Sequence, residues 1–371
     1  MQNKLINVFY RGQKVGRLAE TPERLLAFEY DANWLCDGFS ISPFKLPLEK
    51  RVFIAPRDPF DGNFGVFNDS LPDGWGRLLI DRMLVKKRIN PASISILDRM
   101  AIVGSSGMGA LEYKPEESFF VKSKERFSLQ ALDELAREVE AILNARYSDK
   151  KLEELVKLGG SSGGARPKIL INIDGADWII KFRASADPKN IGKTEFAYME
   201  AAKTAGLDVP EIRLFEGKYF GVKRFDRNKK DRAKKSEKIF MLSASGLLNA
   251  SHRFPTLDYN GLMSATMELM RDIREVEKMF RLMCFNVLTH NRDDHSKNFS
   301  FLYKEMKWQV SPVYDLVYSE GMGGEHATSI NGEGKNPNET HIMAVAKNAG
   351  IDLRKAKQIL EEVKNAVETL S

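Results

Sequence analysis

Polar and apolar residues alternate with a period of two in several short runs near the start of the chain, which predicts β-strands. Such runs occupy residues 5–10, 15–18 and 25–30. From Gly76 onward the apolar residues recur every three or four positions, which predicts a helix. Residues 1–125 are therefore expected to form a separate N-terminal subdomain of mixed α/β type.

The middle of the chain, residues 126–226, combines helical and strand-like periodicity. Three helices are predicted: residues 128–146, with Ser128 as the N-cap, residues 152–158, and residues 192–205. Four strand-like runs pair as two hairpins: residues 169–173 with 178–182, and residues 209–215 with 219–225. Asp174-Gly175, between the first two runs, is a dipeptide typical of a tight hairpin turn.

Residues 227–371 are expected to be mostly helical. A buried helix is predicted from Ile273 to Leu288, where apolar residues recur at three and four. A hairpin follows, with strands at 299–303 and 307–310, and an amphipathic helix at 352–370 closes the chain. The charged run that begins at Asp226 is expected to be a solvated connector.

Composition and charge narrow the class of protein. The chain has 371 residues, 43% of them hydrophobic, which suffices for two domains or for one domain and a catalytic unit split into lobes. A net charge of +6 permits an anionic ligand or DNA contact but does not argue for one. Two distant cysteines, Cys36 and Cys284, exclude a disulfide framework and a cysteine metal cluster. No signal peptide or long apolar segment is visible, so we expect a soluble, cytoplasmic protein.

The segment 289–298, Thr-His-Asn-Arg-Asp-Asp-His-Ser-Lys-Asn, carries the strongest chemical pattern. Asp293 is followed five positions later by Asn298, and Asp315 comes one hairpin further on. In phosphoryl transfer, one carboxylate orients a hydroxyl while an Asn and a second carboxylate hold Mg²⁺. Such residues also cluster in ordinary turns. The hairpin places Asn298 and Asp315 at its two ends, and this favours the metal site over the turn.

Two further patterns concern phosphate binding. Residues 159–164, Gly-Gly-Ser-Ser-Gly-Gly, precede a strand, and such a loop lets backbone N–H groups approach phosphates, although a flexible surface loop is the alternative. Lys181 lies near the end of the next strand, where it is either a solvated residue or a phosphate contact. A helix carrying Glu195 follows, and kinases use such a glutamate to fix the lysine, with Glu200 as an alternative here.

Taken together, these segments resemble the HipA family, the kinase toxins of bacterial type II toxin–antitoxin modules, over nearly the whole chain. Residues 293–300, Asp-Asp-His-Ser-Lys-Asn-Phe-Ser, resemble the family signature Asp-Gly-His-x-Lys-Asn-Phe-Ser. The resemblance makes Asp293 the catalytic base and makes Asn298 and Asp315 the Mg²⁺ ligands. Asp294 stands where glycine is usual, so a register counted from Asp294 stays open.

The resemblance also implies an ATP site and a regulatory serine. The residues that it assigns to ATP are Lys181, Lys223, Arg224, Phe225, His295, Ser162, Gly163 and Gly164. Ser161 matches the serine whose autophosphorylation ejects the Gly-rich loop, with Ser162 as the alternative. The implied fold is α+β and two-lobed, like a protein kinase: an N-terminal subdomain (1–125), an N-lobe-like region (126–226) and a helical C-terminal lobe (227–371).

The function that the resemblance implies is an ATP- and Mg²⁺-dependent serine/threonine protein kinase, the toxin of a toxin–antitoxin module. Its substrate would be an aminoacyl-tRNA synthetase, and its partner a HipB-like DNA-binding antitoxin. The alternatives are an operator-bound corepressor with little kinase activity, or a small-molecule kinase of similar fold. No helix-turn-helix with a basic recognition helix is evident, so DNA is expected to be reached only through the antitoxin complex.

Overall fold

The computed structural model describes residues 3–117, 132–228 and 236–370. They divide into two compact units. The first unit consists of Met1–Ile41, Leu46–Lys193 and Arg213–Phe240, and the second consists of Ser42–Lys45, Thr194–Ile212 and Met241–Ser371.

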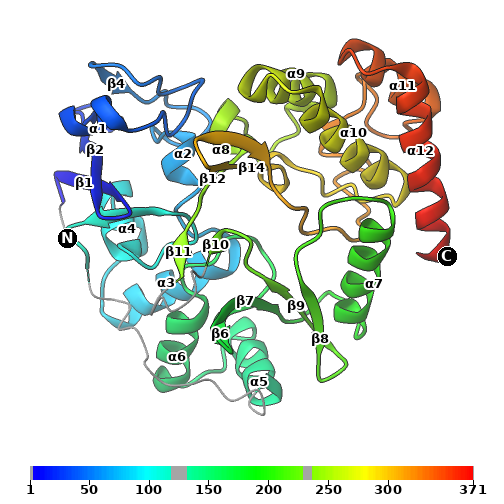
Figure 1. Ribbon diagram of the computed structural model, residues 1–371. Helices are drawn as coiled ribbons and strands as arrows, with labels where there is room; N and C mark the ends of the chain where they lie inside the picture. Colours follow the sequence, from blue (N-terminus) through cyan, green and yellow to red (C-terminus); the bar gives the residue numbers. More distant parts are fainter. Residues whose placement is uncertain (1–2, 118–131, 229–235, 371) are drawn as a thin grey trace. The chain divides into compact units, whose positions relative to one another are not determined.

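The first unit contains a five-stranded antiparallel sheet built from the N-terminal residues (Figure 1). Its strands, in spatial order, are β4 (Val52–Ile54), β3 (Leu26–Tyr30), β2 (Gln13–Glu20), β1 (Leu5–Tyr10) and β5 (Leu111–Lys114). The helices of this part are α1 (Ala32–Asp37), α2 (Gly65–Asn68), α3 (Gly74–Lys86), η1 (Pro91–Ser93) and α4 (Ile96–Val103). Alternate residues of β1 and β3 are buried, which confirms the strands predicted from the period of two.

A second, four-stranded sheet completes the first unit. Its order is β6 (Lys168–Ile173), β7 (Ala176–Lys181), β9 (Tyr219–Lys223) and β8 (Ile212–Phe215). Asp174 and Gly175 both have positive φ, 49° and 82°, as the predicted tight turn requires. The helices α5 (Leu132–Leu143) and α6 (Asp149–Gly159) match the two predicted ones, while Ser128, the expected N-cap, lies outside the described residues. The short strands β10 (Arg227–Asn228) and β11 (Glu237–Lys238) pair with each other.

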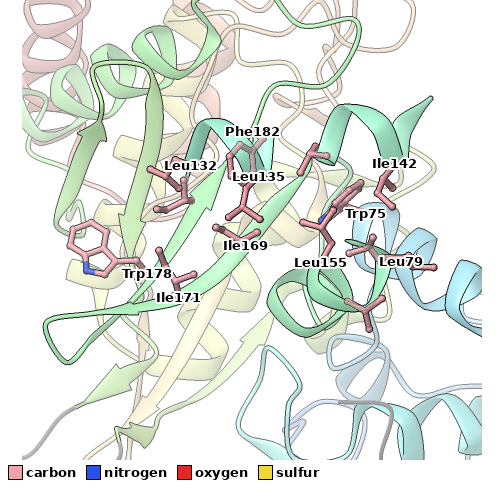
Figure 2. Packing of buried hydrophobic residues seen from close by; sticks show 14 of the residues in the cluster. Trp75, Leu79, Leu132, Leu135, Ile142, Leu155, Ile169, Ile171, Trp178 and Phe182 are labelled. Atoms are coloured by element: carbon pink, nitrogen blue, oxygen red, sulfur yellow. The ribbon is translucent and has the colours of Figure 1, made fainter. Parts of the chain in front are cut away.

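One hydrophobic core joins α3 to the second sheet within this unit. Figure 2 shows Trp75 and Leu79 of α3 packed with Leu155 of α6 and Ile169 of β6. Trp75 is fully buried, and its indole N–H donates to the carbonyl oxygen of Lys168 at 3.1 Å. The N-terminal segment therefore supplies part of the core on which the glycine-rich loop and the Lys181 strand are built.

The second unit is mostly helical, as predicted. Its helices are α7 (Ile191–Thr204, in this unit from Thr194), α8 (Ala244–Leu248), α9 (Tyr259–Met270), α10 (Ile273–Leu288), η3 (Ser296–Asn298), α11 (Glu339–Asn348), α12 (Leu353–Val367) and η4 (Glu368–Leu370). Its strands are β12 (Phe240–Ser243), β14 (Ser300–Lys304) and β15 (Lys307–Val310), which form one sheet, and the parallel pair β13 (Leu257–Asp258) and β16 (Thr328–Ser329). The apolar stripe of α10 packs against α9 and α12 (Figure 1).

Two further expectations concern the cysteines and membrane segments. Cys36 is exposed and Cys284 is buried, and both are free thiols, which confirms that they do not pair. Across residues 3–117, 132–228 and 236–370, no helix combines the length and apolarity needed to cross a membrane.

The position of Trp75 predicts a large effect of truncation. Trp75→Ala should lower the free energy of unfolding by about 3–5 kcal/mol, because it leaves a cavity in a closed core and removes the partner of the Lys168 carbonyl. Urea unfolding followed by circular dichroism measures this change. Trp308→Ala is the matched control, since Trp308 on β15 is only half-buried and should cost clearly less. Equal losses would contradict the assignment of Trp75 to the core.

Candidate functional site

The loop after α10 places two neighbouring aspartates in opposite environments. The Asp293 side chain is 65% exposed, whereas Asp294 is completely buried. Only Asp293 can therefore meet a substrate in this conformation, and the alternative register counted from Asp294 is not compatible with its position.

Asp294 is the centre of a buried hydrogen-bond network. Its carboxylate accepts from the Tyr259 hydroxyl at 2.9 Å, lies 2.9 Å from Nδ1 of His326, and accepts from the backbone N–H of Thr328 at 3.3 Å. The Thr328 hydroxyl donates to the Asp294 carbonyl oxygen at 2.6 Å. Burial, reinforced by the negative charge of Asp294, raises the pKa of Tyr259, so the phenol keeps its proton and remains a donor.

The network continues into α10 and fixes the start of the loop. The Asn286 side-chain amide donates to the Tyr259 hydroxyl oxygen at 3.0 Å, and the Asn291 amide donates to Oδ1 of Asn286 at 2.9 Å. The loop backbone is also bonded to the segment that precedes β16, since Ala327 N–H donates to the Arg292 carbonyl at 3.1 Å. The residues on both sides of Asp293 are thus held by buried bonds, and these bonds determine where its exposed carboxylate points.

Asp293 lies beside two other predicted site residues. The Asn298 side-chain N–H donates to the Asp293 carbonyl oxygen at 2.7 Å, and Nε2 of His295 lies 3.9 Å from the Asp293 carboxylate. Nδ1 of His295 accepts from the Lys297 N–H at 3.3 Å, which assigns the ring proton to Nε2 in the neutral imidazole. Because the Asn298 nitrogen is used in this way, its amide oxygen is the end that could bind a cation.

Asp315 is positioned by the residue before it. The Tyr314 hydroxyl donates to the Lys297 carbonyl oxygen at 2.7 Å and also bonds the Ser300 hydroxyl, so the chain before Asp315 is held against the chain around Asn298. Asp315 itself has a φ of 54°, in the left-handed region that non-glycine residues seldom occupy. Such strain is found at functional sites when the surrounding structure enforces it.

The oxygen chemistry of Asn298 and Asp315 fits Mg²⁺. Amide and carboxylate oxygens are hard ligands, and Mg²⁺ is commonly held by one or two protein groups together with substrate phosphates and water. Among the residues that the structure describes, no three His, Cys, Asp or Glu side chains gather as a self-sufficient metal site. A cation here would therefore depend on oxygens from a bound nucleotide, as expected for a phosphoryl-transfer site.

In the first unit, the glycine-rich loop is held against the N-terminus of α3. Trp75 N–H donates to the Gly164 carbonyl oxygen at 3.1 Å, and the Asp73 carboxylate accepts from the Gly164 N–H. Ser161 and Ser162 are both buried, and the Ser162 hydroxyl donates to the Gly159 carbonyl oxygen at 2.6 Å. In this conformation the loop is closely packed, so the alternative of a flexible surface loop does not describe it.

Two glycines of α3 make this contact possible. A Cβ on Gly74 would lie 2.5 Å from the Gly164 carbonyl oxygen, and one on Gly76 would lie 2.2 Å from the Ser162 carbonyl oxygen. Only glycine permits such close approach of two backbones. Sequence analysis predicted a helix from Gly76 onward and missed this role. Two glycines flanking Trp75 were the signal that could have indicated it.

Lys181 ends β7 and pairs in register with Lys168 of β6. Its ammonium lies 5.4 Å from the centre of the Phe220 ring. The Lys168 ammonium lies close to Gly164, since a Cβ on that glycine would be 2.6 Å from it. The glycine-rich loop and two lysines are therefore neighbours, which is the chemistry that a phosphate chain requires.

The predicted hinge contains a buried ion-pair cluster. Arg224 donates to the Asp226 carboxylate through two nitrogens, at 2.9 and 2.7 Å, and Arg227 donates to the same carboxylate at 2.7 Å. Both arginines also donate to the Met108 carbonyl oxygen, at 2.6 and 3.1 Å. The expectation of a solvated connector is therefore wrong for Asp226 and Arg227, because each of these charges has a buried partner. The rest of the predicted run, from residue 229 onward, lies outside the described residues.

Burial and pairing together set the ionisation of this cluster. Burial alone would raise the pKa of Asp226, but Arg224 and Arg227 hold that pKa below its usual range. Burial lowers the pKa of Arg227 to about 10. Since the Arg224 N–H also donates to the Asp177 carbonyl oxygen at 2.8 Å, both the side chain and the N–H of Arg224 are occupied. A nucleotide base could use only the Arg224 carbonyl and the backbone of its neighbours.

The predicted residues thus form two groups. Lys181, Lys223, Arg224, Phe225 and the loop residues Ser161, Ser162, Gly163 and Gly164 belong to the first unit. Asp293, His295, Asn298 and Asp315 belong to the second, as does Glu195. Glu195 is buried while Glu200 is exposed, which favours Glu195 as the functional glutamate of α7. Its ion pair with Lys181 stays a prediction.

The contrast between the two aspartates gives a direct test. Asp294→Ala should lower the free energy of unfolding by about 3–5 kcal/mol, because Tyr259, His326 and the Thr328 N–H lose a buried charged acceptor. Asp293→Ala is the matched control, and its stability should stay within about 0.5 kcal/mol of the wild type. Thermal and urea unfolding of both variants measure this. Similar stability losses in the two would refute the assigned roles.

Comparison with known proteins places these observations in a family. Residues 160–370 match the HipA-like C-terminal domain, and residues 6–114 match the HipA N-terminal domain. The protein named "Putative kinase Y4mE" of Sinorhizobium fredii is 26% identical over 354 residues, which span 85% of this chain and 78% of that protein. The serine/threonine-protein kinase toxin HipA of Shewanella oneidensis is 22% identical over 325 residues, 78% of this chain and 69% of that protein.

A solved structure shows the same fold. The toxin–antitoxin complex of HipA, HipB and operator DNA from Shewanella oneidensis contains a chain that aligns with a TM-score of 0.72 at 18% identity, over 98% of this chain and 89% of that one. This likeness confirms the predicted α+β, protein-kinase-like fold. Because the C-terminal domain match alone covers more than half of the residues, and the N-terminal match adds most of the remainder, this chain belongs to the HipA family.

Proposed function

We propose that this protein is an ATP- and Mg²⁺-dependent serine/threonine protein kinase that acts as the toxin of a toxin–antitoxin module. The observation that carries the proposal is the Asp293 loop. An exposed carboxylate lies beside the Asn298 amide, which bonds the Asp293 backbone at 2.7 Å, and the neighbouring Asp294 anchors the loop in the core. A general base next to a hard metal ligand is the arrangement that phosphoryl transfer needs.

The roles of the residues follow from their surroundings. Asp293 accepts the proton of the substrate hydroxyl, and His295 at its side can donate a hydrogen bond from Nε2. Asn298 and Asp315 would hold Mg²⁺, which when bound neutralises charge on the phosphates. Lys181, Lys168 and the backbone of Gly163 would bind the phosphate chain, because the N–H groups of Ser162 and Gly164 donate to Gly159 and Asp73 in this conformation. Residues 223–225 would contact adenine through their backbone.

The partner and substrate come from the family. The Shewanella oneidensis relative was solved with HipB and operator DNA, and we extend a HipB-like, DNA-binding antitoxin to this chain. The family resemblance supports an aminoacyl-tRNA synthetase as the protein substrate. An operator-bound corepressor with little kinase activity would not need the complete set of Lys181, Asp293, Asn298 and Asp315, and this set favours an enzyme. A small-molecule kinase of similar fold would need the same residues, so incubation with labelled ATP and a lysate, followed by identification of the labelled species, separates it from a protein kinase.

The kinase assignment predicts which variants lose phosphate transfer alone and which also lose Mg-ATP binding. Asp293→Asn should reduce phosphate transfer by roughly 10²–10⁴-fold while ATP affinity is retained, because only the base is removed. Asp315→Asn and Lys181→Ala should weaken Mg-ATP binding as well, since each removes a group that faces phosphate or metal. Transfer from labelled ATP and calorimetric ATP binding measure the two effects. Wild-type activity in Asp315→Asn or Lys181→Ala would contradict that residue's role.

Autophosphorylation of Ser161 would act as a switch. A phosphate adds about −1.5 to −2 charges, and Ser161 is buried in a loop whose neighbouring residues pack against α3. The loop would have to leave its contacts with Asp73 and Trp75, and ATP binding would fall. Ser161→Ala should stay active, and Asp293→Asn should abolish the modification if the protein modifies itself.

Mass spectrometry after incubation with Mg-ATP identifies the modified serine, and calorimetry compares ATP binding by the modified and unmodified protein. Ser162→Ala is the control, since its hydroxyl bonds the Gly159 carbonyl oxygen. An unmodified loop, or a phosphorylated protein that binds ATP as tightly as the unmodified one, would contradict the proposed switch but not the kinase assignment.

A further inference from the structure

A cavity of about 400 Å³ lies inside the second unit, with Asp293 in its wall. Three segments line it: residues 251–257 between α8 and β13, residues 292–296 of the Asp293 loop, and residues 319–327 before β16. Among the described residues that line it are Asp293 and His295, but neither Asn298 nor Asp315. The cavity therefore opens onto the base rather than onto the candidate metal ligands. The molecule expected to bind in this cavity, next to Asp293, is therefore the phosphate acceptor and not the nucleotide.

Two large apolar side chains in the cavity wall are exposed to solvent. Phe254 is 69% exposed and Met322 is 75% exposed. Exposed aromatic and methionine side chains next to a cavity are typical of surfaces that bind a partner's apolar group. They come from different segments of the wall, so an acceptor that enters the cavity would meet both.

The charged side chains that line the cavity indicate which charge on an acceptor would be favoured. Glu320 and Glu325 are both exposed, and within the described part of the chain neither makes an ion pair. Arg292 donates to the Glu320 backbone carbonyl oxygen at 3.5 Å, not to its carboxylate. Together with Asp293, the wall carries three carboxylates against two guanidinium groups, those of Arg253 and Arg292. A basic group on the acceptor would complement Glu320 and Glu325.

We propose that this cavity binds the acceptor segment of a protein substrate, and that it selects an extended stretch in which the Ser or Thr is flanked by an apolar residue and a basic residue. The apolar residue packs on Phe254 and Met322, and the basic residue faces Glu320 and Glu325. This assignment rests on the proposed kinase function, which it extends to a substrate class.

The chemistry in the cavity balances without a further reagent. The acceptor hydroxyl gives its proton to the Asp293 carboxylate, and its oxygen forms a bond to the γ-phosphorus of ATP. The bond from that phosphorus to the β–γ bridging oxygen breaks, and ADP leaves with the electron pair. Seating the flanking residues on the wall holds the hydroxyl near Asp293, which is the positioning that phosphoryl transfer requires.

A peptide library tests the proposal on the full-length protein. Peptides from a digested bacterial proteome are incubated with the kinase and Mg-ATP, and mass spectrometry gives the residues around each phosphorylated Ser or Thr. Sites with an apolar and a basic neighbour should be modified about tenfold or more faster than sites with neither. Synthetic peptides that differ only by Leu→Ala or Lys→Glu then measure each preference as a ratio of kcat/KM.

Substitutions of the residues that line the cavity test which of them cause each sequence preference. Phe254→Ala and Met322→Ala should abolish the apolar preference, and the double variant Glu320→Lys with Glu325→Lys should reverse the basic one. The matched controls lie on the β14–β15 turn of the same unit: Met306→Ala, where Met306 is 87% exposed, and Glu305→Lys, where the side chain is 85% exposed. The controls should keep both preferences, and all variants should bind Mg-ATP like the wild type.

The outcomes separate this proposal from the kinase assignment. If the wild type autophosphorylates but shows no preference, or if the wall variants keep the wild-type preference, the acceptor cavity is refuted and the kinase stands. If the wall variants lose antitoxin binding while peptide selection is unchanged, the surface belongs to the antitoxin and the proposal also fails. A wild type that neither binds Mg-ATP nor transfers phosphate would refute the kinase function itself.

Discussion

The second unit depends on the burial of one carboxylate. Removing Asp294 from water would cost several kcal/mol if its charge were not paired with donors. Tyr259 from α9, His326 and the Thr328 N–H supply those donors, at 2.9, 2.9 and 3.3 Å. These groups lie far from Asp294 along the chain, so satisfying the carboxylate also fixes α9 and the segment before β16 around the loop. Asp294 points into the core and Asp293 points outward, so the exposure of Asp293 accompanies the burial of its neighbour.

A different constraint shapes the first unit, where two stretches of backbone approach more closely than any side chain allows. Gly74 and Gly76 of α3 meet the carbonyl oxygens of Gly164 and Ser162, and Trp75 between them enters the core below. The glycine-rich loop is thus held by the N-terminal segment of the protein as well as by its own turns. In a HipA-family protein, this contact gives the N-terminal segment a direct influence on the loop that would cover ATP.

The burial of Asp294 and the contact of α3 with the glycine-rich loop both affect how a kinase of this kind would select its acceptor and bind ATP. The base, its neighbouring amide and the cavity wall all belong to one unit and share the loop that Asp294 anchors. In the proposed kinase, acceptor selection and proton transfer would therefore depend on the same loop, whereas the glycine-rich loop and Lys181 are supported by the separate core around Trp75. The ion-pair cluster of Arg224, Asp226 and Arg227 stiffens the hinge-like segment between β9 and β10, since three buried charges are satisfied only in one arrangement.

The amino-acid sequence by itself determined the elements and the candidate chemistry. Periodicity and turn residues depend on neighbours a few positions apart, so β1, α10 and the Asp174-Gly175 turn could be predicted, and the spacing of Asp293, Asn298 and Asp315 indicated phosphoryl transfer. Tertiary structure alone decided which of the two adjacent aspartates is exposed and that Asp226 is buried among arginines. It also decided that α3 holds the glycine-rich loop and that Phe254 and Met322 line the same cavity as Asp293. The contacts of α3 with the loop, and those that bring Phe254 and Met322 to the Asp293 cavity, join residues tens of positions apart, and so do the hydrogen bonds that bury Asp294. The arginine partners of Asp226 are its near neighbours in sequence, but both arginines also bond the carbonyl oxygen of Met108, more than a hundred positions away. The burial of a charge is determined by the partners that the fold brings to it, which local sequence does not contain.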